Sequence, residues 1–429
     1  MKIIPQLNLF EENDFEELGD LERLQRVLEV IPDERLIQRL NEIRGNGRND
    51  WPLIGMWNAF IASFLFNHET VEQLLRELRR NKQLRAVCGL KPVGRQQPDG
   101  KWKAFYAPSK SSFSKFLKNL ENCSDLLQEI FEELVQYMYN NLEDFGTYLM
   151  IDGKAIQSFA KRPSNKEDGR QGEHDADWCR KTYTCTTPSG EVVTKTMKWF
   201  GFRLHLIADA TYEMPVAFTV TKASNSERTE CKNLISTLEE EHPEYLDACQ
   251  YLMGDKGYDS TPILTMLKED GITPIIDICN HWKDGEETHQ YKDTPLIYNY
   301  KGDVFYVPDA GEPIKLSYKG YDKSSDSLRY GFHPKHHDKR IFRIKCSTDP
   351  RVFNPVARDS KKWERLYKKR TGVERINGRI DRDYQFERHT IRGLKKMNMF
   401  ILTTFIVYLG MAKHKVEQGQ TTGLARLYA

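Results

Sequence analysis

Three acidic residues, far apart in the chain, stand where segments of a folded sheet could bring them together. Asp152 follows the apolar residues YLMI in the segment TYLMIDGKAI, and Asp255 follows YLMG in the strand-like segment CQYLMGDKGYDS. Glu374 lies in a late helical segment. Strand ends open onto the face where α/β folds generally place their sites, so two carboxylates there and one from a neighbouring helix can converge. Taken singly, each acid could instead cap a turn, because Asp-Gly is a common turn signal.

Oxygen ligands of this kind suit hard divalent cations. Mg²⁺ and Mn²⁺ prefer carboxylates, with phosphate oxygens and water in the remaining positions. Two such ions about 3.5–4 Å apart can stabilise both the attacking and the departing oxygen in phosphoryl transfer. The three acids therefore predict a site that holds two Mg²⁺ or Mn²⁺ ions and acts on phosphodiesters.

The segments around the two aspartates predict an α/β unit. Strand-forming and helical runs follow one another in the order strand, strand, strand, helix, strand, helix, strand. They lie at 147–156, 198–210, 215–221, 226–241, 249–255, 261–269 and 273–278. This order is the layout of a ribonuclease H-like fold, in which a mixed sheet lies between helices. A polar loop at 161–177 separates the first strand from the second.

The rest of the chain has a different texture. Apolar residues recur at helical spacing in the first part, so an all-α domain that could bind DNA is predicted there. Short β-like pieces between polar turns predict a β-rich insertion, after which the chain returns to helix and completes the α/β core. The predicted boundaries are 1–145 for the helical domain, 146–279 and 349–415 for the core, 280–348 for the insertion and 416–429 for a polar tail.

Composition limits the kind of protein. The chain has 429 residues, 39% of them hydrophobic, and can bury a large core. Its net charge of +2 says little about partners, but basic residues cluster at 76–85 and 361–370, where they could attract nucleic acid. Eight cysteines without a CxxC pair, and no signal peptide, favour a reduced, cytoplasmic protein. The apolar stretch 399–412 is shorter than the roughly 20 residues that a bilayer needs and is predicted to be a buried helix.

The motifs around the acids carry a family resemblance. The strings IDGKAI, GDKGYDS and LYKKRTGVERINGRI resemble the DDE transposases of bacterial insertion sequences, specifically those with an InsH-type helical N-terminal domain. The resemblance spans nearly the whole chain. It implies that Asp152, Asp255 and Glu374 are the catalytic residues and the metal ligands.

The family's terminal signature is Tyr, two residues, Arg, three residues, Glu, six residues, Lys. Tyr367 and Arg370 match it together with the late glutamate, and steps of three and four place these side chains on one helical face, where they could grip phosphate oxygens. The lysine position is occupied by Asp381. Arg382 or Arg379 is the candidate for supplying the missing cation.

The resemblance implies an enzyme that binds the inverted-repeat ends of a mobile element, hydrolyses the phosphodiester there and joins the freed 3′-hydroxyl to target DNA. Its implied partners are double-stranded DNA and a second copy of the chain in the synaptic complex, in a bacterial, nucleoid-associated setting. Two alternatives stay open: a ribonuclease H-like nuclease without strand transfer, and a transposase-derived DNA-binding regulator with an inactive centre. The expected DNA contacts are Tyr367, Lys369, Arg370, Arg382, Arg76, Arg79 and Arg80.

Other residues are weaker candidates. His205 and Arg203 lie on the presumed second strand and could point toward the site, although a structural histidine fits the pattern equally well. Tyr258 and Asp259 follow the second aspartate and could shape its turn. Four residues of metal-ligand type lack the paired spacing of a zinc site, so a surface loop is the simpler interpretation. These four are His333, His336, His337 and Cys346.

Overall fold

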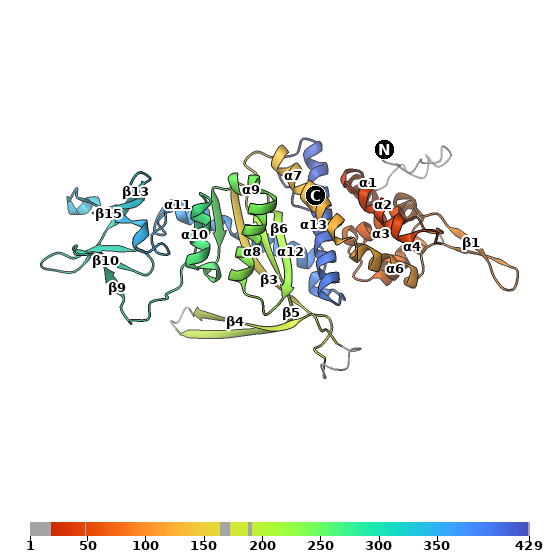
Figure 1. Ribbon diagram of the computed structural model, residues 1–429, viewed down its shortest axis with the longest axis horizontal. Coiled ribbons are helices and arrows are strands. Elements are labelled where there is room, and N and C mark those ends of the chain that lie inside the picture. Colours follow the sequence, from red (N-terminus) through yellow and green to blue (C-terminus); the bar gives the residue numbers. More distant parts are fainter. Residues whose placement is uncertain (1–18, 48, 164–171, 188–190, 428–429) are drawn as a thin grey trace.

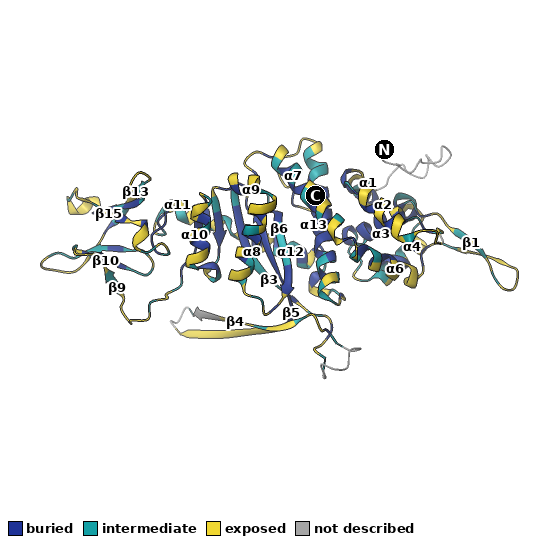
Figure 2. Cartoon of the chain, viewed as in Figure 1, coloured by how far each residue is buried: buried dark blue, intermediate teal, exposed yellow. Residues whose placement is uncertain are grey.

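The computed structural model describes residues 19–427 except 48, 164–171 and 188–190. The chain is elongated (Figure 1). A group of helices lies at one end, a sheet with helices on both faces lies in the middle, and a β-rich part lies at the other end. Buried residues run through all three parts (Figure 2).

Helices dominate the N-terminal part, as predicted. Two of them begin at side-chain caps, because Thr70 accepts a hydrogen bond from the Gln73 amide (3.2 Å) and Ser109 accepts one from the Ser112 amide (3.1 Å). The helices are α1 (Asp20–Val30), α2 (Glu34–Arg44), α3 (Leu53–Leu65), α4 (Val71–Arg80), α5 (Lys82–Cys88), α6 (Lys110–Glu121) and α7 (Ser124–Asn141).

The prediction that this part is essentially all helical missed one element. Strands β1 (Val93–Gln96) and β2 (Trp102–Phe105) form an antiparallel hairpin between α5 and α6. The cause is the turn sequence between the strands, where Pro98 and Asp99 precede Gly100, whose φ of +81° is one that glycine adopts without strain.

The central sheet is mixed and has helices on both sides. Its strands lie in the order β4-β5-β3-β7-β8, and β6 pairs with β5. β3, β7 and β8 run parallel to one another, whereas β5 is antiparallel to β3, β4 and β6. The strands are β3 (Tyr148–Gln157), β4 (Asp177–Thr186), β5 (Val192–Asp209), β6 (Met214–Lys222), β7 (Tyr251–Gly254) and β8 (Thr273–Ile276).

Four strands, not the three predicted, precede the next helix, because the sequence analysis missed β4 and began β5 too late. β4 and the first part of β5 form a two-stranded ribbon that projects from the sheet (Figure 1). Residues 192–198 of this ribbon are exposed, and burial along β5 begins at Trp199. A strand without a buried face has no need of alternating apolar residues, so the period-two signal is absent from this ribbon.

Helices α8 (Glu227–Glu241) and α12 (Thr371–Arg382) lie on opposite faces of β3. Successive side chains of a strand point to opposite faces. Asp152 contacts α12 through Asn377, whereas a Cβ atom added to Gly153 would meet Glu227 of α8. The short α9 (Pro243–Asp247) and α10 (Thr261–Glu269) follow α8 along the chain.

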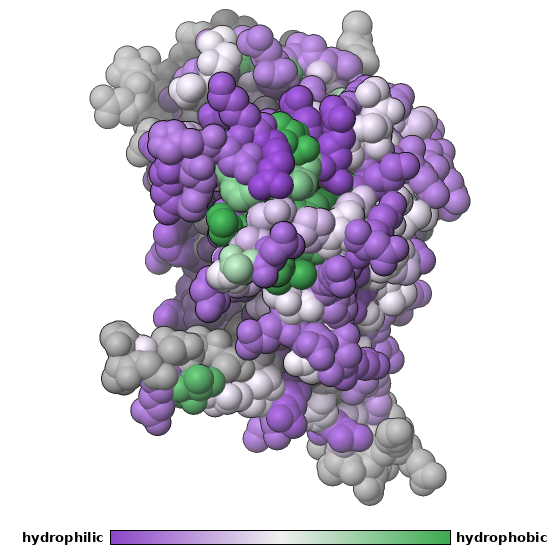
Figure 3. All heavy atoms as spheres, turned by 90° about the vertical axis from the view of Figure 1, so that its left-hand side faces the viewer, coloured by the Kyte–Doolittle hydropathy of each residue, from purple (hydrophilic) through white to green (hydrophobic). Residues whose placement is uncertain are grey.

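Residues 288–345 contain the predicted short β segments, which form two small sheets with a hydrophobic core of their own. Viewed from this end, the surface is mostly hydrophilic, with small separate hydrophobic groups (Figure 3). One sheet contains β9 (Thr288–Gln290), β10 (Leu296–Asn299), β11 (Val304–Tyr306) and β12 (Ile314–Lys315), and the other contains β13 (Ser317–Asp322), β14 (Ser327–Gly331) and β15 (Ile341–Lys345).

The chain then returns to helix, with α11 (Lys361–Lys369) running into α12 and α13 (Leu394–Glu417) near the end. In the described residues, α13 is long and apolar enough to cross a membrane by length and composition alone, but 72% of its most apolar window is buried inside the protein. It packs against α1, α3, α7 and β6. The prediction of a buried helix at 399–412 is therefore confirmed.

Candidate active site

Asp152 and Asp255 lie side by side within the sheet, but Asp152 does not end its strand as predicted, because β3 continues to Gln157. β3 and β7 are parallel neighbours in which Met150 is opposite Met253. Continuing the same register by two residues places Asp152 beside Asp255, which follows the last residue of β7. Asp255 also begins a short 3-10 helix at 256–258, and its Oδ1 accepts a hydrogen bond from the Gly257 amide (2.7 Å). The parallel register of β3 and β7 thus brings two of the three predicted acids together.

The surroundings of Asp152 disfavour a lone negative charge. Burial and the nearby charge of Asp255 raise the pKa of Asp152 above its ordinary value. Asn377 of α12 donates a hydrogen bond to Asp152 Oδ2 (2.8 Å), and Lys181 and Arg370 oppose the rise in pKa through their positive charges. A bound cation would relieve this repulsion.

Glu374 lies one turn before Asn377, in the first turn of α12. Its side chain is 58% exposed, and Oε1 accepts a hydrogen bond from Arg370 Nη2 (2.9 Å). Tyr367, seven residues before Glu374 and on α11, is half-buried and stacks on Trp363 with ring centroids 4.5 Å apart. The signature residues therefore share the helical face that borders Asp152.

The three acids do not surround a single point in this structure. Among the described residues, only other groups bring the ligand atoms of three candidate residues within 4.8 Å of one another. One group is Glu132, Glu241 and His242, and the other is Asp259, Cys279 and His281. Of the three predicted acids, the two aspartates lie side by side, whereas Glu374 is bound to Arg370.

At the position of the signature lysine, Asp381 accepts a hydrogen bond from Lys154 of β3 (2.5 Å). Lys154 is almost completely buried and lies two residues after Asp152, on the same face of the strand. Arg379, one of the two residues expected to replace the lysine, is instead bound to Glu213 (2.5 Å). Arg382 is exposed and pairs with its neighbour in sequence.

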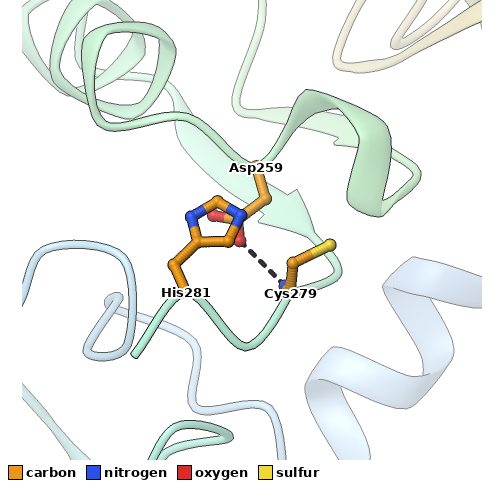
Figure 4. Close-up of side chains that lie close together, drawn as sticks. All are labelled: Asp259, Cys279 and His281. Atoms are coloured by element: carbon orange, nitrogen blue, oxygen red, sulfur yellow. Dashed lines mark hydrogen bonds between the residues drawn. The ribbon is translucent and has the colours of Figure 1, made fainter. Parts of the chain in front are cut away.

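Asp259 holds the turn after Asp255 in place, as expected. It is fully buried and accepts hydrogen bonds from the Cys279 amide (2.9 Å) and from Arg351 Nε (3.0 Å) and Nη2 (2.5 Å). Figure 4 shows Asp259 facing Cys279 and His281. Because Arg351 and the amide already satisfy its oxygens, we interpret this group as a structural junction rather than a metal site.

His205 and Arg203 do not reach the two aspartates. His205 is fully buried, and its Nε2 lies 3.0 Å from Thr221 Oγ1. Burial lowers the pKa of His205 to about 4, so the ring is neutral near pH 7. Arg203 Nη1 lies 3.4 Å from Glu227 Oε1 at the start of α8. Sequence reasoning missed Glu227, whose only signal was its place after the capping residue of a helix.

The predicted basic contacts occupy two regions. Lys369 lies over the ring of Tyr148 (4.2 Å), which is the first residue of β3, four residues before Asp152. On α4, three basic side chains are exposed: Arg76, Arg79 and Arg80. Arg85, expected to belong to the same basic surface, is instead buried and donates hydrogen bonds to the carbonyls of Leu78 (2.7 Å) and Arg79 (3.1 Å).

The histidine-rich segment has no metal-site geometry. His333 caps the short 3-10 helix at 334–336, and Cys346 is buried. In the described part of the chain, neither residue belongs to a group of three candidate ligands. The simpler interpretation as a surface loop fits the three exposed histidines but is wrong for Cys346, which lies in the hydrophobic core of the β-rich part.

Comparison with known proteins gives two family matches. Residues 158–409 match the family model described as transposase DDE domain, and residues 10–102 match that described as transposase domain (DUF772). Among solved structures, the chain is similar to a piggyBac transposase in a cryo-EM structure of its synaptic complex with hairpin DNA. The sequence identity is 10% and the TM-score is 0.37, over 96% of this chain and 80% of that chain, which carries no argument about function. No curated protein matches the chain.

Proposed function

The chain belongs to the DDE transposase family, as its motifs indicated, and we propose that Asp152, Asp255 and Glu374 are its catalytic acids and metal ligands. The observation that carries this proposal is the parallel register of β3 and β7, which sets the two aspartates side by side within the fold of a DNA transposase. We further propose that the mixed sheet and its helices form a ribonuclease H-like core.

The residues present fit a divalent cation. The donor set consists of carboxylate oxygens, which Mg²⁺ and Mn²⁺ prefer. Two neighbouring carboxylates, one of them with a raised pKa, lie beside the buried Tyr258 hydroxyl, which makes no hydrogen bond in the described residues. A pair of Mg²⁺ ions would supply an activated nucleophile and stabilise the departing oxygen of the phosphodiester.

The protein's own residues hold the two aspartates in place and would bind the DNA beside them. Asp152 is held by Asn377, and Asp255 by its turn, so both are in place before substrate arrives. Arg370 would change its partner, because its guanidinium donates to Glu374 here and could donate to a DNA phosphate oxygen instead. This exchange would release Glu374 toward the two aspartates at the moment when DNA binds.

Double-stranded DNA is the proposed partner, as inverted-repeat ends and as target. The exposed arginines of α4 would contact phosphates at the repeat, and Tyr367, Lys369 and Arg382 would contact the strand near the site. We propose a homodimer in the synaptic complex, because two ends must be joined, and association with the bacterial nucleoid. The boundaries 1–145, 146–279, 280–348, 349–415 and 416–429 stand as the proposed domain division.

The experiment that tests this proposal measures nicking and strand transfer on DNA that carries the element's inverted repeats. Asp152→Ala, Asp255→Ala and Glu374→Ala should each abolish Mg²⁺-dependent cleavage while gel-shift binding of the ends persists. Glu364→Ala, which removes an exposed acid of the preceding helix, is the matched control and should cleave normally. Metal-dependent cleavage by any of the first three variants contradicts the assignment. Cleavage without joining of the 3′-hydroxyl would identify a nuclease instead.

A further inference from the structure

A fourth carboxylate lies near Asp255 and next to the glycine that follows Asp152. Glu227 is the first residue of α8, on the face of the sheet opposite α12, and its side chain is 14% exposed. No motif that we used to assign the site includes it. Two glycines, Gly153 directly after Asp152 and Gly257 two residues after Asp255, lie next to its carboxylate.

These glycines leave the space that the Glu227 carboxylate occupies. A Cβ atom added to Gly153, the neighbour of Asp152, would lie 2.8 Å from Glu227 Oε1. A Cβ atom added to Gly257 would lie 3.2 Å from Glu227 Oε2 and 2.7 Å from Asp255 Oδ1. The carboxylate of Glu227 therefore sits between the chain segments that carry the two aspartates, with Oε2 on the Asp255 side.

The two oxygens of Glu227 have different surroundings. Oε1 lies 3.4 Å from Lys181 Nζ and 3.4 Å from Arg203 Nη1. Among the described residues, none donates a hydrogen bond to Oε2. One oxygen is thus held by cationic side chains, and the other remains available to a ligand.

An independent observation also points to a ligand here. The Tyr258 side chain is 1% exposed, and its hydroxyl has no hydrogen-bond partner in the described part of the chain. Burial, followed by the charges of Asp152 and Glu227, raises the pKa of Tyr258 well above its ordinary value. A buried hydroxyl without a partner is costly, and water in the coordination sphere of a cation would satisfy it.

We propose that Glu227 is a fourth carboxylate of the metal site, with Oε2 binding the cation shared by Asp152 and Asp255 directly or through one of its water molecules. This inference rests on the proposed function, because it requires the cation site at the two aspartates. Lys181 and Arg203 hold Glu227 in place and balance its charge in the absence of metal. The metal site thus draws residues from both faces of the sheet, Glu227 from one and Glu374 from the other.

The test measures Mn²⁺ binding to the full chain without DNA, by isothermal titration calorimetry or by the electron paramagnetic resonance signal of free Mn²⁺. Glu227→Gln keeps the size of the side chain and one acceptor oxygen but removes its charge. It should weaken Mn²⁺ binding about tenfold or more, as the loss of a ligand or of a partner of the bound water does. Glu230→Gln, one turn later on α8, is the matched control and should bind Mn²⁺ like the wild type.

A second variant displaces the same carboxylate without removing it. Gly153→Ala places a methyl group against Glu227 Oε1, which is the far end of a flexible side chain and can move. Gly153→Ala should therefore also weaken Mn²⁺ binding, and adding Glu227→Gln to it should weaken binding less than the two separate effects predict. Thermal unfolding of each variant shows whether it is folded.

The outcomes separate this inference from the proposed function. If Asp255→Asn weakens Mn²⁺ binding but folded Glu227→Gln binds as tightly as the Glu230→Gln control, Glu227 only neutralises Lys181 and Arg203, and the inference is overturned. If Asp255→Asn also binds Mn²⁺ like the wild type, the proposed metal site itself fails. If Glu227→Gln does not fold, the result of Gly153→Ala decides in the same way.

Discussion

Replacing Arg351 with methionine should destabilise the protein and disturb the loop that carries Asp255. Arg351 donates to both oxygens of the fully buried Asp259, at 3.0 and 2.5 Å, and to the Cys279 carbonyl at 3.0 Å. Asp259 lies in the loop that follows Asp255, Cys279 precedes the β-rich part, and Arg351 follows it. One guanidinium therefore joins both ends of that part to the loop that carries Asp255.

The burial of this ion pair sets the size of the effect. Removing one partner leaves the other charge buried and uncompensated, which costs about 3–5 kcal/mol. The matched comparison is the pair between Arg343 and Asp322, in which the arginine side chain is 61% exposed. Because water screens such pairs, Arg343→Met should cost no more than about 1 kcal/mol.

Urea unfolding followed by circular dichroism gives the free energy of unfolding, and hydrogen exchange of the Cys279 amide reports on the junction itself. Exchange of that amide should speed up strongly in Arg351→Met, because the amide donates to Asp259. Mg²⁺-dependent nicking should slow in the same variant and remain normal in Arg343→Met. If the two variants differ by less than about 1 kcal/mol in the free energy of unfolding, the reasoning from burial is refuted.

Three more predictions concern single contacts. Asn377→Ala should raise the pKa of Asp152 further and move the acid limb of the pH profile of nicking to higher pH; an unmoved limb would count against a role for this hydrogen bond. Because burial lowers the pKa of His205 to about 4, the wild type should lose on the order of 3 kcal/mol of stability as the pH falls from about 6.5 to 4, and urea unfolding of His205→Gln should lack this loss. Asp381→Lys should lower the melting temperature more than Asp381→Asn, since it sets two ammonium groups together, and adding Lys154→Met should restore part of the difference; equal melting temperatures for the two single variants would contradict this.

The aspartate pair could be predicted from the sequence because buried strands leave a strong local signal. Each aspartate follows a short apolar run, and parallel neighbouring strands place such positions side by side, although β3 continues beyond Asp152. The position of Glu374 relative to them could not be predicted, because it depends on how α12 packs and on the competing ion pair with Arg370. The family signature identified the residue but not its conformation.

Other parts of the site left no readable local pattern. Glu227 looks like any acidic residue in the first turn of a helix, where the helix dipole favours negative charge. The pairing of Lys154 with Asp381 joins residues that are far apart in the sequence, so it appears only in three dimensions. The exposed ribbon of β4 and β5 was missed for a related reason, since polar strands lack the alternation that a buried face requires.

Helix α13 connects the parts of the molecule that recognition and catalysis would use. It packs against α1 and α3 at one end of the molecule and against β6 of the sheet, and its side chains belong to a single hydrophobic core shared by both. A core of this kind does not hinge without exposing apolar surface. The arginines of α4 and the paired aspartates therefore stay at a fixed separation. In the proposed DNA complex, this separation would set how many base pairs lie between the phosphates bound by α4 and the phosphodiester at the aspartates.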